Sequence, residues 1–190
     1  MKVEQAKRLG EQDHRSLVLW AADCAEHVLP YFEENYSEDD RPRKAIEAGH
    51  AWARGELSMS KARAAAFAAH AAARDADHAV ARAAARAAGH AAATAHVAGH
   101  ARHAAAYAVK AATAAAIPTD AGTASVTERD WQCRRLPESV EDVNALLDKP
   151  VLPALVAHLQ LGRLPIVAGK SKAEALSPIA RWQVSKRKSA

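Results

Sequence analysis

The sequence predicts an all-α fold: a single compact Ala-rich helical bundle of about six helices with a partly ordered basic C-terminal tail. Three observations support this prediction. Apolar residues recur at steps of three and four along much of the chain, which places them on one face of a helix. Alanine, the strongest helix former, fills the middle of the chain. Strand-like alternation of useful length is not visible in the sequence.

Length and composition narrow the class of protein. A chain of 190 residues can bury a core without metals or disulfides, so no cofactor is expected. The two cysteines, Cys24 and Cys133, form no C-x-x-C pair, and we expect both to be small core residues. A net charge of +4 allows nucleic-acid binding without implying it.

The first helix is predicted between residues 13 and 36. Its apolar face is marked by helical spacing of Leu17, Trp20, Cys24, Val28 and Tyr31. Pro30 should bend or end this helix, because proline lacks an amide hydrogen and its ring clashes with the preceding turn. Residues 33–40 then form an acidic connector.

Two further helices follow the connector. Asp40 precedes Arg41-Pro42, a suitable start for a second helix that runs to Gly55. Ser58 is the expected N-cap of a third helix that ends near Arg74. The sequence Asp75-Ala76-Asp77 offers a break and a new cap.

A fourth helix is predicted over residues 78–97 and a fifth over residues 100–116, separated by Ala98-Gly99. Because alanine offers little side-chain area, these helices should pack by close backbone approach. The rare large residues should then supply much of the core contact, and these are Phe67, Tyr107, Trp52 and Trp20.

Turn-forming residues between 117 and 125 separate the last predicted helices. Thr127 is expected to cap a sixth helix that runs to Leu136, and Ser139 a short helix that ends near Asp148. We therefore assign residues 1–148 to the bundle domain. Residues 149–190 form an extension interrupted by Pro and Gly, with a basic tail at Lys186-Arg187-Lys188.

His96, His100 and His103 are spaced by four and three residues, so one unbroken helix would place them on one face. A metal site could use that geometry. The predicted fifth helix has no Asp or Glu, however, no H-E-x-x-H pattern is present, and Gly99 interrupts the run. Metal binding is therefore not favoured. We expect these imidazoles to hydrogen-bond between close-packed helices or to lie at the surface.

The start of the second predicted helix is strongly charged. Asp39, Asp40, Arg41 and Arg43 are adjacent there. Acidic groups at this end complement the helix dipole, so a cap with a solvated face accounts for the pattern. Alternatively, the arginines contact a carboxylate or a phosphate of a partner.

Several segments resemble a known family, the bacterial immunity proteins with an Imm-5-like domain. The resemblance covers roughly residues 14–140, and its most specific part lies in the second predicted helix. The segments that carry it are Leu19–Pro30, Asp40–Ala48, Ala51–Glu56, Ala83–Ala91, Thr94–Val97, His100-Ala101, Ala104–Ala111 and Arg129–Gln132. The resemblance implies an all-helical bacterial domain that neutralises a toxin by binding it. It carries over no catalytic residues.

We therefore expect an immunity-type binding protein, not an enzyme, whose partner is a cognate bacterial toxin. The expected contact residues lie at the charged helix start and on the His-rich face, and they are Asp39, Asp40, Arg41, Arg43 and His90. One alternative is a metalloprotein or enzyme that uses His96, His100 and His103. A second is a weak nucleic-acid binder that uses the basic tail. A homodimer through an Ala-rich face stays open.

The N-terminus predicts the location of the protein. It runs into charged residues without an apolar segment or a cleavage site, so no signal peptide is expected and the location should be cytoplasmic. Charged residues and histidines interrupt the Ala-rich middle every few positions. No transmembrane helix or membrane partner is therefore expected.

Overall fold

The structure is a computed structural model, and it describes residues 10–137. Within this range six long helices are joined by one single-turn helix and one 3-10 turn, and no strand occurs. The all-α prediction is confirmed. The elements are α1 (Glu11–Val28), α2 (Pro30–Glu33), α3 (Arg41–Ala53), α4 (Met59–Asp75), α5 (Ala79–Thr94), α6 (His100–Ala115), η1 (Pro118–Asp120) and α7 (Ala121–Arg135).

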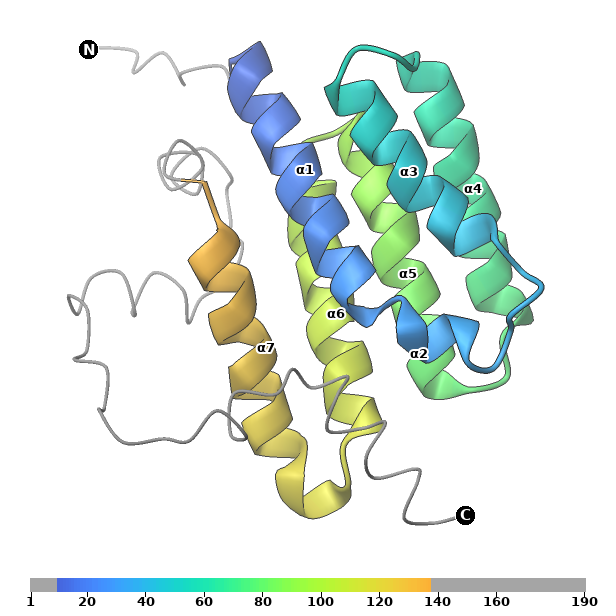
Figure 1. The fold of residues 1–190 in the computed structure, drawn as a ribbon, viewed down its shortest axis with the longest axis vertical. Helices are drawn as coiled ribbons and strands as arrows, with labels where there is room; N and C mark the ends of the chain where they lie inside the picture. Colours follow the sequence, from blue (N-terminus) through green and yellow to red (C-terminus); the bar gives the residue numbers. More distant parts are fainter. Residues whose placement is uncertain (1–9, 138–190) are drawn as a thin grey trace, which may run out of the picture.

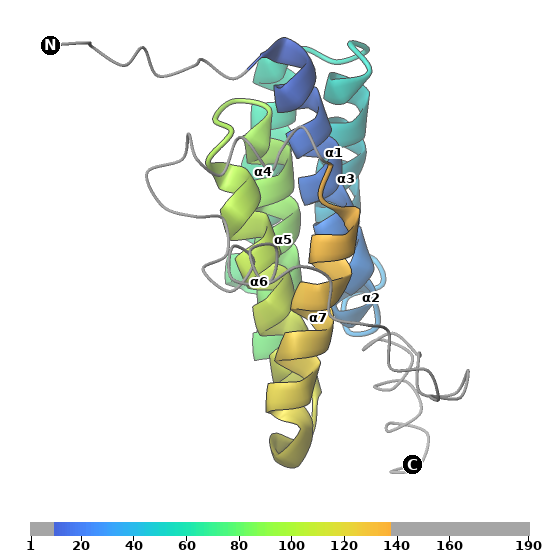
Figure 2. The same cartoon turned by 90° about the vertical axis from the view of Figure 1, so that its left-hand side faces the viewer.

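Helix α5 lies at the centre of the bundle and packs against α1, α3, α4 and α6. Figure 1 shows α3 and α4 on one side of α5 and α6 on the other, with α7 beyond α6. Figure 2, turned by 90°, shows α7 lying along the outside of the bundle. Because α5 has neighbours on most sides, it needs small side chains around most of its circumference, and ten of its 16 residues are buried.

The core is built largely from alanine, as the composition predicts. Alanine methyl groups from α4, α5 and α6 are fully or almost fully buried, and they let the helices approach closely. Gly49 of α3 extends this close packing, because a Cβ there would lie 3.7 Å from Val18 and 3.9 Å from the backbone of α5 at Ala92. The largest buried apolar side chains come from α1 and α2 and the residue between them. They are Leu17, Trp20, Leu29, Tyr31 and Phe32.

The predicted set of large core residues is wrong in part. Trp20 is fully buried, as expected, but Phe67 is 60% exposed. Phe67 lies on the outer side of α4, where the Arg63 guanidinium covers its ring at 5.5 Å. Trp52 and Tyr107 are half-buried. Phe67 is excluded from the core because the buried side of α4, which packs against α5, consists of alanines, and Phe67 lies outside that side.

Helix boundaries follow the predicted signals at several positions. The first helix ends before Pro30, which opens α2. The Ser58 hydroxyl caps α4 by accepting a hydrogen bond from the amide of Lys61 at 3.4 Å. Gly55 follows α3 with φ of 79°, a left-handed conformation that favours glycine. Asp40, by contrast, makes no side-chain cap for α3, and the Asp39 carboxylate accepts a hydrogen bond from the amide of Arg41 instead.

Two helix boundaries differ from the prediction. Helix α5 ends at Thr94 rather than near residue 97. Helix α7 begins at Ala121, so Thr127 lies inside it and caps nothing. The earlier start is explained by Pro118, which opens a 3-10 turn that leads directly into α7 with the backbone angle that a helix start requires. The helix predicted over residues 139–148, the extension and the basic tail all lie outside the described residues.

The cysteine prediction is confirmed for Cys24, which is buried, whereas Cys133 is half-buried. Both are free thiols, and burial raises the pKa of Cys133 to about 11, so its thiol stays protonated near neutral pH. None of the helices within residues 10–137 has the length and apolar character that crossing a membrane requires.

Candidate binding surface

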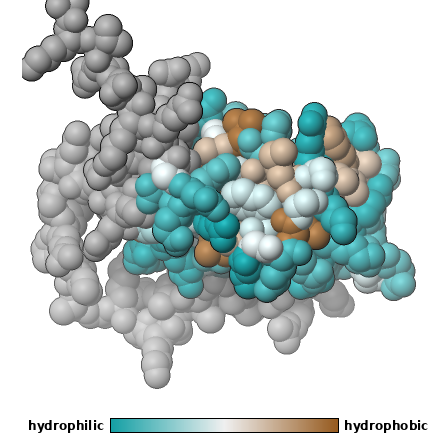
Figure 3. Space-filling view, turned by 90° about the horizontal axis from the view of Figure 1, so that it is seen from above, coloured by the Kyte–Doolittle hydropathy of each residue, from teal (hydrophilic) through white to brown (hydrophobic). Residues whose placement is uncertain are grey.

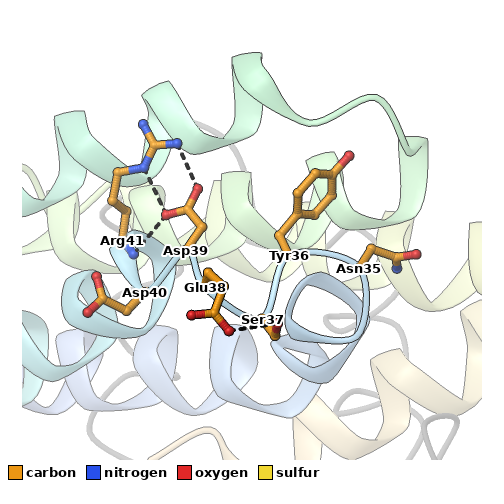
Figure 4. Close-up of a pocket in the computed structure, with 7 residues that line it drawn as sticks. All are labelled: Asn35, Tyr36, Ser37, Glu38, Asp39, Asp40 and Arg41. Atoms are coloured by element: carbon orange, nitrogen blue, oxygen red, sulfur yellow. Dashed lines mark hydrogen bonds and ion pairs between the residues drawn. The ribbon is translucent and has the colours of Figure 1, made fainter.

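The first candidate region is the charged loop, residues 35–41, which connects α2 to α3 and lines an open pocket of about 610 Å³. Figure 4 shows Arg41 reaching back to Asp39 within this loop. The Arg41 guanidinium donates to both Asp39 carboxylate oxygens, at 2.8 Å and 2.7 Å. It also donates to Asp75 at 2.8 Å, which ties the start of α3 to the end of α4.

The other predicted charges of this region are paired in the same way. The Arg43 guanidinium donates to both carboxylate oxygens of Glu33, at 2.6 Å and 2.8 Å. Asp40 pairs with Lys44 at 2.8 Å. The hydrogen bonds from Arg41 lower the pKa of Asp39, so this carboxylate stays ionised. The structure thus brings Asp39, Asp40 and Arg41 together, and it uses their charges to hold the loop in place.

The second candidate region is a cluster of four imidazoles from three helices: His70 of α4, His90 of α5, and His100 and His103 of α6. The His90 ring lies at its centre. Its centroid is 4.8 Å from His70, 5.4 Å from His100 and 5.2 Å from His103. The Tyr107 ring stacks on His90 at 5.3 Å. Nδ1 atoms of His90 and His100 lie 3.3 Å apart, so one imidazole donates and the other accepts.

Gly89 makes room for this cluster. A Cβ at Gly89 would lie 2.6 Å from the His70 ring, closer than side-chain carbons approach one another. The absence of a side chain on α5 at this position therefore lets the His70 ring approach the helix backbone closely. This close approach brings His70 to His90.

The cluster is uncharged at neutral pH. Burial, together with neighbouring cations, lowers the pKa of His90 to about 3 and that of His70 to about 4. Burial also lowers the pKa of His100 and His103, with Arg102 contributing to both shifts. Neutral imidazoles can both donate and accept hydrogen bonds, which suits them to contact a polar partner surface.

The three histidines considered as an alternative metal site, His96, His100 and His103, do not share one helical face. His96 lies in the connection between α5 and α6 and is exposed, and α6 begins only at His100. His100 and His103 instead join His90 and His70, which come from other helices. In residues 10–137, one set of His, Cys, Asp or Glu side chains places its ligand atoms within 4.8 Å of one another, and it lies elsewhere, at Asp23, Glu26 and His50.

Unpaired cations border the imidazole cluster. Helices α4, α5 and α6 together carry seven Lys and Arg residues and one acid, Asp75 at the end of α4. In the described chain, every ion pair of a lysine or an arginine falls between Glu11 and Asp75. We define the imidazole face as the four histidines, Tyr107 and the cations beside them: Arg74, Arg86, Arg102 and Lys110.

The exposed hydrophobic side chains of the described residues do not gather into one patch. Six large apolar side chains are exposed, and they come from five different parts of the fold: Leu19, Met59, Phe67, Val97, Ile117 and Val126. Figure 3 shows the hydrophobic residues of the upper end as separate brown patches among hydrophilic ones. Charge and hydrogen bonding, rather than an apolar patch, therefore distinguish the imidazole face from the remaining surface.

Sequence reasoning missed a buried polar cluster between α1 and α7. Glu128 is fully buried, and its carboxyl group accepts hydrogen bonds from His27 at 2.9 Å and from the Gln132 amide at 2.9 Å. The Gln132 amide also donates to the carbonyl of Ala105 on α6. The Trp20 indole donates to the carbonyl of Gln132 at 3.0 Å. These contacts fix α7 to both α1 and α6.

One sequence signal could have indicated this cluster. The inner side of α7 carries no stripe of large apolar residues, so its buried side has to be polar. Glu128 and Gln132, spaced by four residues, are the pair on that side. His27, which contacts Glu128, also stacks its ring in parallel on the Trp131 ring at 3.8 Å. The Arg135 guanidinium covers the Trp131 ring at 4.0 Å.

The described residues thus form an all-α bundle whose surface is charged. The chain belongs to the Imm-5 like putative immunity protein family, whose model matches residues 7–139. The family resemblance predicted from the sequence is thereby confirmed. No curated protein and no solved structure matches the chain.

Proposed function

We propose that the protein is an immunity protein that neutralises a cognate bacterial toxin by direct contact, and that the imidazole face makes this contact. Family membership supports the class of function. The choice of surface rests on one observation: the cations of α5 and α6 have no acidic partner among the described residues, whereas those of the charged loop do. The partner surface should therefore be acidic.

Neutral histidines add specificity to this surface. Each imidazole of the cluster has one nitrogen that donates and one that accepts, so a partner must match the pattern as well as the charge. Arg86 and Arg102 flank the histidines and can each bind a carboxylate in a bidentate manner. Tyr107 offers a rigid ring. Tyrosine is enriched among the few residues that contribute most of the binding energy at protein interfaces.

The test is co-expression with each candidate toxin encoded near the gene, with growth of the cells as the measurement. The wild-type protein should restore growth, and the double variant R86E/R102E should not. The matched control is Lys44→Glu, a charge reversal next to the charged loop whose exposed pair with Asp40 contributes little stability. Loss of rescue by K44E together with full rescue by R86E/R102E would move the contact to the charged loop.

The remaining expectations about this chain stay predictions. They are the cytoplasmic location, a homodimer and the absence of an enzymatic role. Nucleic-acid binding through Lys186-Arg187-Lys188 concerns residues outside those that the structure describes.

A further inference from the structure

A second cluster of ligand-type side chains lies away from the imidazole face, between α1 and α3. Asp23 and Glu26 are spaced by three residues on α1 and share a face of that helix, and His50 reaches them from α3. One carboxylate oxygen of each acid and one imidazole nitrogen all lie within 4.8 Å of one another.

None of these three side chains makes a hydrogen bond or an ion pair within the described chain. This contrasts with the charged loop, where Asp39 and Asp40 each have a cation within 2.8 Å. Arg135 lies close enough to Asp23 to act on it electrostatically, but its guanidinium covers the Trp131 ring instead. Two carboxyl groups and an imidazole thus converge with their lone pairs unused.

We propose that Asp23, Glu26 and His50 bind one divalent transition-metal ion, which links α1 to α3. Carboxylate oxygen together with imidazole nitrogen suits Zn²⁺ and related ions, whereas Mg²⁺ prefers oxygen alone. Ligand atoms around a tetrahedral Zn²⁺ lie roughly 3.4 Å apart, so the three side chains need to move by only about 1 Å. This site is independent of the proposed toxin contact.

Three protein ligands leave the fourth position of a tetrahedral ion open. Glu47, three residues before His50 on α3, is exposed and lies outside the set of converging ligand atoms. Water can fill the fourth position, as it does at zinc sites with three protein ligands.

The test is calorimetric titration of the untagged, metal-free full chain with Zn²⁺ alone. Wild-type protein should bind one ion, and its melting temperature should rise by several degrees at saturation. Asp23→Asn, which keeps the shape of the side chain, and His50→Ala should each weaken binding by at least about tenfold. Titration with Mg²⁺ should show no binding.

The matched control separates the two groups of histidines. The double variant H100A/H103A removes half of the imidazole cluster and should bind Zn²⁺ as wild type does. Loss of binding in H100A/H103A, or unchanged binding in both Asp23→Asn and His50→Ala, would overturn the proposal. Circular dichroism of the metal-free variants distinguishes lost ligation from lost folding, and Asp23→Asn decides the outcome if His50→Ala is unfolded.

Discussion

Gly89 is the residue that gives the imidazole cluster its space. Gly89→Ala should destabilise the protein by about 1–2 kcal/mol, because the new methyl group would lie 2.6 Å from the His70 ring. Chemical denaturation measures this change. The control is Gly122→Ala in α7, where a Cβ meets nothing within 4 Å and the substitution should stabilise by about 0.5–1 kcal/mol.

A double variant tests the cause. In G89A/H70A the ring that the methyl group would strike is gone, so adding the alanine to H70A should be neutral or stabilising. If Gly89→Ala costs as much in the H70A background as in the wild type, the crowding lies elsewhere and the role given to Gly89 is wrong.

His70 and His90 make stability depend on pH. Their folded pKa values, about 4 and about 3, lie below the ordinary value of 6.5, so the unfolded chain binds more protons between these limits. Their contribution is fully present above pH 6.5 and is lost as the pH falls toward 4. Urea midpoints should therefore fall between about pH 7 and about pH 5, and by less in His90→Gln. An equal fall in both proteins would contradict the assignment.

Helix α7 is attached by polar contacts. Glu128→Ala should destabilise the chain by about 3 kcal/mol, because it removes the group that pairs with His27 and Gln132 in a buried position. Hydrogen exchange should also speed up along α7 more than along α5. Arg129→Ala, an exposed change on the same helix, is the control and should alter neither measurement. Uniform loss of protection in all helices would show that α7 does not open separately.

The elements themselves were predictable where local signals decide them. Pro30, Gly55 and Ser58 act within a turn of their own position, and each marks a real boundary. Asp40 and Thr127 are capping residue types as well, but the neighbouring Asp39 and the turn at Pro118 decide those helix starts. Composition likewise predicts that α4 packs through alanine. It does not say which side of α4 faces inward, and Phe67 was misplaced for that reason.

The candidate sites also differ in how far the sequence could predict them. The residues of the charged loop are adjacent in sequence, so their proximity was predictable, although their mutual pairing was not. The imidazole cluster joins His70, His90 and His100 across three helices, and only the packing of α4, α5 and α6 brings them together. His96 shows the opposite case: its spacing suggests one face with His100 and His103, but the helix starts at His100, after the break predicted at Ala98-Gly99, and leaves His96 outside it.

At the scale of the whole molecule, charge is unevenly distributed. Most acidic side chains of the described residues, and all ion pairs of their lysines and arginines, lie between the start of α1 and the end of α4, while α5 and α6 carry cations without acids. Association with an acidic toxin should therefore be accelerated electrostatically. Its rate constant should fall on the order of tenfold from low to high salt, and R86E/R102E should remove most of that dependence. Stopped-flow mixing measures both; a rate insensitive to salt would exclude an electrostatic contact.

The buried alanines of α5 determine which positions of this protein tolerate substitution. A buried alanine facing another helix backbone can be exchanged only for glycine or for something larger, and either exchange costs stability. The outward positions of α4 and α6 carry no such constraint. Substitutions there can therefore change what the surface recognises one side chain at a time, while the buried positions of α5 stay fixed.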